Sequence, residues 1–183
     1  MQFTLTYSGH LPSSGSPDEK DVIRRHLHPQ LEELWTHDPL TIHPQFLAPA
    51  QEGSISVLTE VGGRAFAPLV SSRLHLLAEL DITMLRPERP GGIVTSGGDI
   101  DNKLKTLFDA FGIPTAQQLA QTSTRLVAPS PMFTLLEDDH LIKRVSVDTD
   151  RLLAAPAPDH VQLQIRVTLR ASKLIYGNVN LIS

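Results

Sequence analysis

The longest alternating segment of the chain reads Ser72-Arg73-Leu74-His75-Leu76-Leu77-Ala78-Glu79-Leu80-Asp81-Ile82-Thr83-Met84-Leu85. Apolar side chains fall at every second position from Leu74 to Met84, and mostly polar or charged ones lie between them. Because successive side chains of a strand point to opposite faces of a sheet, this pattern predicts a long strand over 72–85 with one buried face. The Pro- and Gly-rich stretch 86–92 should end it.

Further strands are predicted at 3–7, 141–149 and 161–169, and a hairpin around Gly62-Gly63 is predicted within 53–70. A first helix should start at a cap on Asp18, be bent or interrupted at Pro29, and pack through one stripe of side chains. This stripe consists of Val22, Ile23, His26, Leu27, Leu31, Leu34 and Trp35.

A second helix is predicted from Ile100 to Phe111, because its apolar residues follow helical spacing and Gly112 and Pro114 supply a stop. Residues 113–136 read as a long connection with room for one short helix. Together these elements predict an α/β (α+β) fold over 1–183, a single mixed-sheet domain packed by helices.

The composition excludes several classes of protein. The chain has no cysteine, so it forms no disulfide and has no thiol nucleophile, thiolate-bound zinc or iron–sulfur site. Its net charge of −4 argues against a protein that coats nucleic acid by bulk electrostatics. The C-terminal strands are different, because basic residues outnumber acidic ones there, which is compatible either with a basic face or with ordinary solvated charges on the sheet surface. These residues are Lys143, Arg144, Arg151, Arg166, Arg170 and Lys173.

The first seven residues, Met1 to Tyr7, lack the basic and apolar regions of a signal peptide. No apolar run approaches the roughly 18 residues of a membrane span. We therefore expect a cytoplasmic protein without a membrane partner.

Two acidic stretches contain the candidate functional residues of the chain. The first is Gly97-Gly98-Asp99-Ile100-Asp101-Asn102-Lys103-Leu104-Lys105, and the second is Glu137-Asp138-Asp139. Asp99 and Asp101 can converge if Asp99 precedes the helix, which the Gly97-Gly98 pair allows. Clustered carboxylates repel one another unless a cation neutralises them, and oxygen-only ligands favour Mg²⁺, or Mn²⁺ in its place.

Lys105 follows Asp101 by one helical turn on the same face, whereas Lys103 points elsewhere. A hard divalent cation polarises a phosphoryl oxygen and lowers the pKa of a bound water. A lysine beside it would stabilise the charge that develops on a phosphate. The residues therefore point to phosphodiester hydrolysis.

These residues resemble the RusA-like Holliday junction resolvases, a family of crossover junction endodeoxyribonucleases. The likeness rests on Asp99-Ile100-Asp101-Asn102, on Lys105, Phe108 and Asp109, and on Glu137-Asp138-Asp139. It covers 97–147 strongly. The family's proline- and asparagine-bearing N-terminal segment is echoed only faintly by Leu11-Pro12-Ser13-Ser14, and the stretch 111–137 is longer here.

The resemblance implies a RusA-like fold and magnesium-dependent cleavage of branched DNA such as a four-way junction. It implies Asp99, Asp101 and Asp139 as metal ligands and catalytic residues, with Asp138 a further candidate ligand and Lys105 the catalytic cation. Resolving a two-fold symmetric junction takes two nicks, so one site per chain implies a homodimer. Its shared core or interface could involve the 74–84 strand and a stripe of Leu104, Leu107, Phe108 and Phe111.

Simpler interpretations remain open for each residue. Asp99 or Asp101 would serve as a helix cap, and Lys105 would pair with Asp101 or Asp109. Glu137-Asp138-Asp139 alone is typical of a solvated turn, and Asp109 of an exposed helix charge. His140, the only histidine beside the site, is a weak candidate for a general base.

Three other functions could use the same residues. The leading alternative is a non-catalytic DNA- or protein-binding module that retains the fold. An EF-hand is excluded because Lys103 and Leu104 occupy positions that need a ligand and a glycine. A glycosyltransferase-type Asp-x-Asp lacks a Gly-rich nucleotide-binding turn upstream of Asp99.

Overall fold

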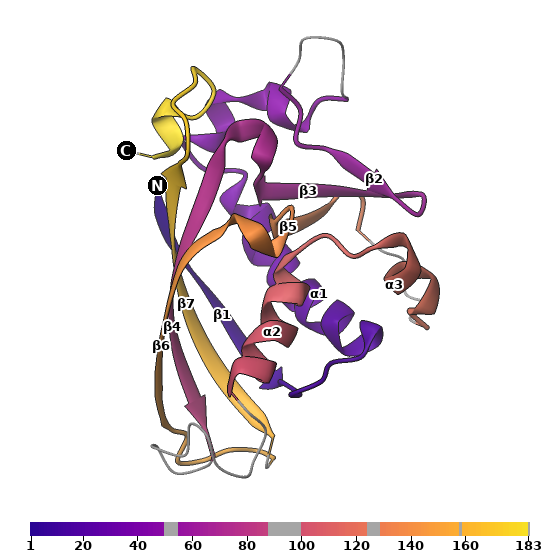
Figure 1. The fold of residues 1–183 in the computed structure, drawn as a ribbon, viewed down its shortest axis with the longest axis vertical. Coiled ribbons are helices and arrows are strands. Elements are labelled where there is room, and N and C mark those ends of the chain that lie inside the picture. The colour runs from indigo at the N-terminus through magenta and orange to yellow at the C-terminus, as the bar shows by residue number, and fades with distance from the viewer. Residues whose placement is uncertain (50–54, 88–99, 124–128, 158, 183) are drawn as a thin grey trace.

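The computed structural model describes residues 1–49, 55–87, 100–123, 129–157 and 159–182. Two mixed sheets and three α-helices form this part of the chain (Figure 1). The larger sheet has the order β1-β7-β4-β6, and the smaller has the order β2-β3-β5. The strands are β1 (Gln2–His10), β2 (Thr59–Val61), β3 (Arg64–Val70), β4 (Leu76–Arg86), β5 (Met132–Leu136), β6 (Ile142–Arg151) and β7 (His160–Ala171).

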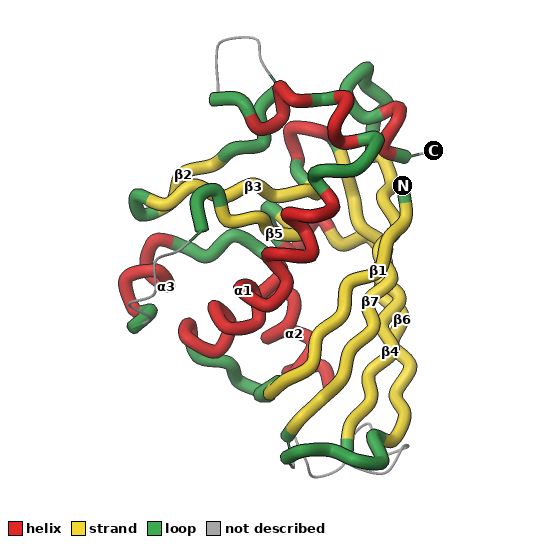
Figure 2. The backbone as a smooth tube through the Cα atoms, turned by 180° about the vertical axis from the view of Figure 1, so that it is seen from behind, coloured by secondary structure: helices red, strands yellow, loops and turns green. Residues whose placement is uncertain are grey.

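In the larger sheet β4 and β6 are parallel and the other pairs are antiparallel, and in the smaller sheet β3 and β5 are the parallel pair. The helices are α1 (Pro17–Leu34), α2 (Ile100–Phe111) and α3 (Ala116–Gln121). All three lie on one side of the larger sheet (Figures 1 and 2). The α/β (α+β) class is thus confirmed, with the strands divided between two sheets. No helix in the described ranges is long and apolar enough to cross a membrane.

The strand β4 occupies an inner position of the larger sheet, and every second side chain from Leu76 to Met84 is buried. The predicted start at Ser72 was wrong, because Ser72–Leu74 forms a 3₁₀ turn, η3. His75 then adopts a left-handed conformation with φ of 52°, which interrupts the extended chain before β4 begins.

The residues proposed for a shared core or interface lie in the core of the single chain. Leu107 and Phe111 of α2 are at most 1% exposed, and Leu76, Ala78, Leu80, Ile82 and Met84 are equally inaccessible, at 2% or less. Leu104 and Phe108 pack against the same core. These side chains are therefore committed to folding and do not offer a dimer interface.

The helix α1 begins two residues earlier than predicted. Ser16, rather than Asp18, is the N-cap, and it forms a capping box with Glu19. Pro29 lies inside the helix without ending it, because Ile23, Leu27 and Leu31 on either side of it are buried in the core. Val22 is 59% exposed and does not belong to the packed stripe.

The strand β5 is an element that the sequence pattern did not reveal. The connection predicted over 113–136 holds the short helix α3 but ends in this strand, which pairs in parallel with β3. All five residues of β5 (Met-Phe-Thr-Leu-Leu) are buried, so the strand is a continuous buried run. Such a run lacks the alternation that identifies a half-buried strand.

Arg24 joins α1 to the end of α2. Its guanidinium donates to the carbonyl oxygens of Gly112 and Asp109, both at 3.1 Å, and its Nη1 lies 3.7 Å from an oxygen of Asp21. Burial lowers the pKa of Arg24 to about 10, so it stays charged at neutral pH. It satisfies carbonyls that the helix end leaves without partners.

Replacing Arg24 by Met should lower the free energy of unfolding by about 2–3 kcal/mol, because buried carbonyls then lose charged donors. Urea denaturation measures this loss. Arg170→Met removes a half-exposed guanidinium and should cost less than about 1 kcal/mol. Equal losses in the two variants would contradict the role given to Arg24.

Candidate functional site

The α2 helix presents Asp101 and Lys105 on its exposed side. One oxygen of Asp101 accepts a hydrogen bond from the Asn102 amide at 2.8 Å, which satisfies a free N–H at the helix start. Asp101 is the second residue of α2 and lies inside the helix, so this contact to the next amide is not an N-cap; it engages one of the two carboxylate oxygens. Lys103 is on another face, as predicted, and is only 3% exposed. Asp99 lies outside the described residues.

Asp138 and Asp139 stand where β5 passes into β6. Asp138 caps a 3₁₀ turn, η4 (Asp139–Leu141), by accepting from the His140 amide at 3.0 Å. An oxygen of Asp138 also lies 2.6 Å from Nδ1 of His140. These bonds, the backbone one first, lower the pKa of Asp138. His140 is thus occupied by its own turn, which does not support its use as a base.

Asp139 has the opposite shift. Burial raises its pKa, and the neighbouring carboxylates of Asp138 and Asp109 raise it further. Two adjacent acids therefore resist carrying full charge together. A cation bound between them would relieve that repulsion, which is the electrostatic condition of a metal-binding carboxylate pair.

Asp109 connects this pair to α2, which contacts η4. The prediction of an exposed helix charge was wrong, because its side chain is 28% exposed and binds Lys20 of α1. The distance from Lys20 Nζ to Asp109 Oδ2 is 2.7 Å. Asp101 lies two helical turns before Asp109, about 12 Å along the axis at the usual rise.

Asp138 and Asp139 are thus adjacent, with Asp109 near enough to raise the pKa of Asp139, whereas Asp101 and Lys105 lie nearer the start of α2. Within the described ranges, which leave out Asp99, no group of three or more His, Asp or Glu is arranged to hold a metal ion. The carboxylates that are described suit a hard cation in their chemistry, since all their ligand atoms are oxygen.

A polar cleft of about 460 Å³ is lined by Lys105 and Asp109 among these residues. The loop between β1 and α1 forms one wall, and α1 and α2 form the others; the lining includes Ser13, Ser14, Lys20, Asn102, Lys105 and Asp109. The loop approaches α2 closely at Gly15, whose amide donates to Thr106 Oγ1 at 3.1 Å. A Cβ at Gly15 would lie 2.4 Å from Thr106 Cγ2, so glycine is required for this approach.

Sequence patterns did not identify Lys20, Ser13 or Ser14 as parts of the site. The one signal for the serines was the faint family-like segment 11–14. Nothing local to α1 marked Lys20, because its partner is 89 residues away in the chain. Lys105 has no acidic partner among the residues described, so the expected pairing with Asp101 or Asp109 is not seen.

Glu137 is structural, and the prediction of a solvated turn was wrong for this residue. One of its oxygens accepts from Ser71 Oγ at 2.9 Å and from the Ser72 amide and hydroxyl at 2.8 Å each. Burial acts to raise the pKa of Glu137, but these bonds outweigh it and lower the pKa. Glu137 thereby ties the end of β5 to the η3 turn before β4.

Replacing Glu137 by Gln should lower the melting temperature at pH 7 and shift it less in acid. A carboxylate whose pKa is lowered by folding stabilises the protein above its unfolded value, near 4.5. That stabilisation is lost as the pH falls through the lower, folded-state pKa. Melting curves from pH 7 to pH 3 should show the two proteins converging below 4.5. A constant difference across this range would contradict the assignment.

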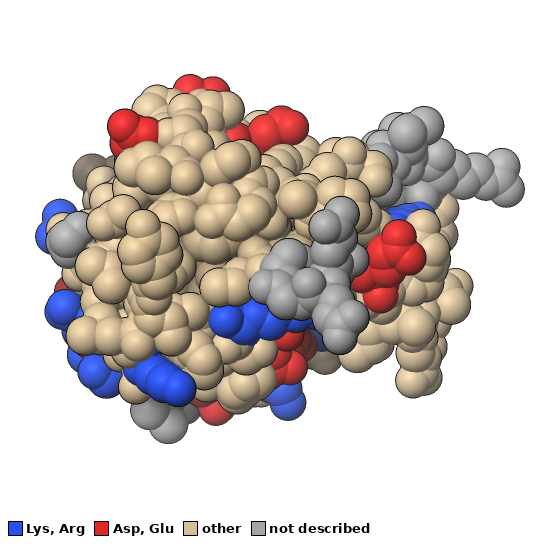
Figure 3. All heavy atoms as spheres, turned by 90° about the horizontal axis from the view of Figure 1, so that it is seen from above, with Lys and Arg blue, Asp and Glu red and all other residues tan. Residues whose placement is uncertain are grey.

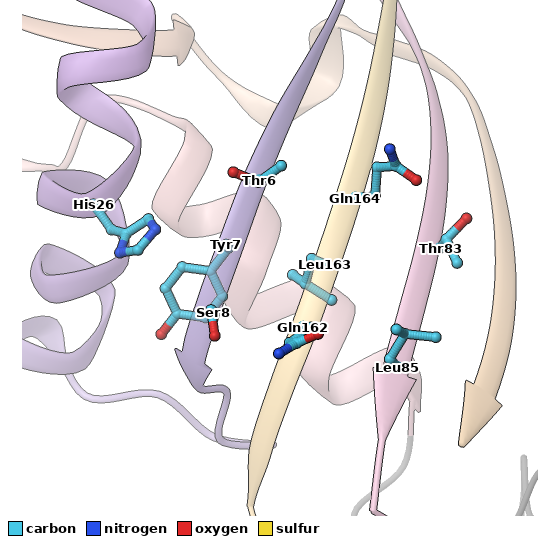
Figure 4. Close-up of a pocket in the computed structure, with 9 residues that line it drawn as sticks. All are labelled: Thr6, Tyr7, Ser8, His26, Thr83, Leu85, Gln162, Leu163 and Gln164. Atoms are coloured by element: carbon cyan, nitrogen blue, oxygen red, sulfur yellow. The ribbon is translucent and has the colours of Figure 1, made fainter. Parts of the chain in front are cut away.

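A second hollow, of about 300 Å³, lies along β1, β7 and β4 of the larger sheet and reaches His26 of α1. Figure 4 shows its lining residues, which come from β1, β7, β4 and α1. They include Thr6, Ser8, Thr83, Gln162, Gln164 and His26, but no Asp, Glu, Lys or Arg. This hollow therefore lacks the charged groups that metal or phosphate chemistry needs.

The basic face considered for the C-terminal strands is present but largely neutralised. Seen from above, Lys and Arg side chains gather on the side formed by the larger sheet (Figure 3). Glu79 lies within 4 Å of Lys143, Arg144 and Arg170, and Arg144 also binds Asp81 through two nitrogens at 2.8 and 3.0 Å. Because acids compensate much of this charge, the cleft beside α2 remains the better candidate for binding an anion.

Comparison of the chain with protein-family models and with curated proteins finds no match. The resemblance to RusA-like resolvases therefore rests on the motif residues themselves. Its implications for this chain are proposals, which the geometry around α2 supports to different degrees.

Proposed function

We propose that the chain is a magnesium-dependent, structure-selective DNA endonuclease that resembles a Holliday junction resolvase and hydrolyses phosphodiester bonds at branched DNA. The observation that carries this proposal is the cleft beside α2, where Lys105 has no acidic partner in the described chain and lies one turn from Asp101. A cationic cleft next to exposed carboxylates suits a phosphate and a hard metal ion together. A cytoplasmic location and the absence of a membrane partner belong to the same proposal.

Each residue has a distinct role in this account. Asp101, Asp139 and, from outside the described ranges, Asp99 would hold Mg²⁺, or Mn²⁺ in its place, with Asp138 as a further ligand. The bound ion would supply Lewis acidity and a water of lowered pKa. Lys105 would place its ammonium beside the phosphate and stabilise the charge that develops as the bond breaks. Burial, and after it the neighbouring carboxylates, raise the pKa of Asp139, and a bound cation would offset the repulsion between the carboxylates.

Incubation with labelled DNA of three shapes tests this function. Four-way junctions, flaps and linear duplexes of matched sequence should be compared with Mg²⁺ or with EDTA. We expect cleavage only with Mg²⁺ and mainly of the branched substrates. Equal cutting of linear duplex would remove structure selectivity from the proposal.

The second candidate is a non-catalytic DNA- or protein-binding module. The specific observation in its favour is that one oxygen of Asp101 already accepts a hydrogen bond from the Asn102 amide, which gives this carboxylate a structural contact without metal. This candidate predicts DNA or protein binding that Mg²⁺ leaves unchanged, and no cleavage of any substrate.

A homodimer is expected if the chain resolves junctions, since one site per chain supplies one nick. Because the 74–84 strand and the α2 stripe lie in the core of one chain, the pairing surface must be elsewhere. Light scattering at micromolar concentration, with and without a four-way junction, should give the mass of two chains. A monomer in both conditions would rule out paired cleavage and leave simple nicking or the non-catalytic module.

A further inference from the structure

We propose that the cleft beside α2 is a phosphate-binding subsite for the DNA backbone, and that Lys20 is a positioning residue which keeps Lys105 available to that phosphate by holding Asp109. This inference rests on the proposed function for the identity of the ligand as DNA. It adds a residue from α1 that neither the sequence motif nor the family resemblance includes.

The shape and chemistry of the cleft suit a phosphate group. Its volume of about 460 Å³ admits a phosphate with its flanking sugar atoms. The hydroxyls of Ser13 and Ser14, the Asn102 amide and the two lysines are all hydrogen-bond donors. Asp109 is the one acid in this lining. A site that contains mainly donors suits an anion with several acceptor oxygens.

The cleft contains two lysines and one aspartate among its described lining residues. Lys20 and Asp109 form a close pair, at 2.7 Å, with side chains 17% and 28% exposed. Their charges cancel, and Lys105 remains as the one cation of the lining without an acidic partner in the described chain. The described residues that line the cleft therefore sum to one net positive charge.

Without Lys20, Asp109 would lose the cation that it binds. Asp109 lies four residues after Lys105 on α2, a spacing at which opposite charges pair on a helix surface. Losing Lys20 would let Asp109 capture Lys105, and the net charge of the cleft would fall to zero. Lys20 thus acts on the phosphate through Asp109 and Lys105.

A set of three variants distinguishes this role from direct contact. DNA binding is measured by fluorescence anisotropy with a labelled four-way junction in EDTA, so that neither metal nor cleavage is needed. Lys20→Met should weaken binding by about 3–10-fold. Asp109→Asn should bind as tightly as the unaltered protein or more tightly. The double variant Lys20→Met/Asp109→Asn should recover to within about twofold, because no acid remains to capture Lys105.

The controls cover folding and charge. Lys143→Met removes an exposed lysine from the far face of the larger sheet and should leave binding unchanged. Thermal unfolding checks each variant, and Asp109→Asn keeps the proposal testable if Lys20→Met does not fold. Loss of binding in the double variant equal to that in Lys20→Met would overturn the role of Lys20 through Asp109.

The outcomes also separate this inference from the nuclease proposal. Binding that depends on Lys20 and is rescued by Asp109→Asn, in a protein that cuts no DNA with Mg²⁺, would support the subsite and defeat the nuclease. Magnesium-dependent cleavage by a protein whose DNA affinity is the same with Lys20→Met would support the nuclease and overturn the subsite.

Discussion

Replacing Asp101 by Asn should reduce magnesium-dependent cleavage at least about 1,000-fold while the fold stays intact. The change removes a negative charge from the proposed metal site but keeps the size of the side chain. Asp101 is exposed, and an Asn oxygen can still accept from the Asn102 amide. Because the variant relieves repulsion among carboxylates, its melting temperature without metal should be unchanged or higher.

Single-turnover cleavage of a labelled four-way junction, with Mg²⁺ in excess, measures this loss. Asp148→Asn is a matched control, since Asp148 is an exposed acid on β6, away from α2. It should cleave as the unaltered protein does. Wild-type turnover in Asp101→Asn would exclude this residue from the mechanism.

Replacing Lys105 by Ala should lower the rate of the cleavage step about 100-fold and weaken DNA binding much less. Its ammonium is assigned to charge that is greatest in the transition state, so its loss should appear in turnover more than in affinity. Comparing the single-turnover rate constant with the dissociation constant measured in EDTA separates the two effects.

Lys103 offers a comparison on the same helix. Lys103→Ala should affect turnover less than Lys105→Ala, because Lys103 lies on another face. Since Lys103 is 3% exposed, its replacement should instead lower the melting temperature through lost packing. Equal losses of turnover in the two variants would indicate a general electrostatic effect and contradict a specific role for Lys105.

Local patterns predicted the elements that have a regular hydrophobic spacing or a clear turn signal. The limits predicted for the second helix, Ile100 and Phe111, are those of α2, and Gly62-Gly63 forms the expected hairpin between β2 and β3. The strand β5 could not be recognised because it is buried on both faces. The start of β4 was misplaced because η3 and the left-handed His75 continue its apolar pattern without its conformation.

The candidate site was predictable only where it is local in sequence. Asp101 and Lys105 were proposed from their spacing on one helix, and Asp138 and Asp139 from the resemblance of their acidic stretch to the family motif. The Lys20–Asp109 pair, the loop at Gly15 and the hydrogen bonds of Glu137 join segments at least 65 residues apart. No periodicity in the sequence records such contacts, because they arise from the packing of α1, α2 and the two sheets.

Cleavage of a labelled four-way junction by the unaltered protein, in Mg²⁺ and in EDTA, tests the central claim most directly. The account predicts cut strands with Mg²⁺, none with EDTA, and recovery when excess Mg²⁺ is returned. Intact junction in both conditions, with the DNA nevertheless bound, would contradict the nuclease and establish the binding module.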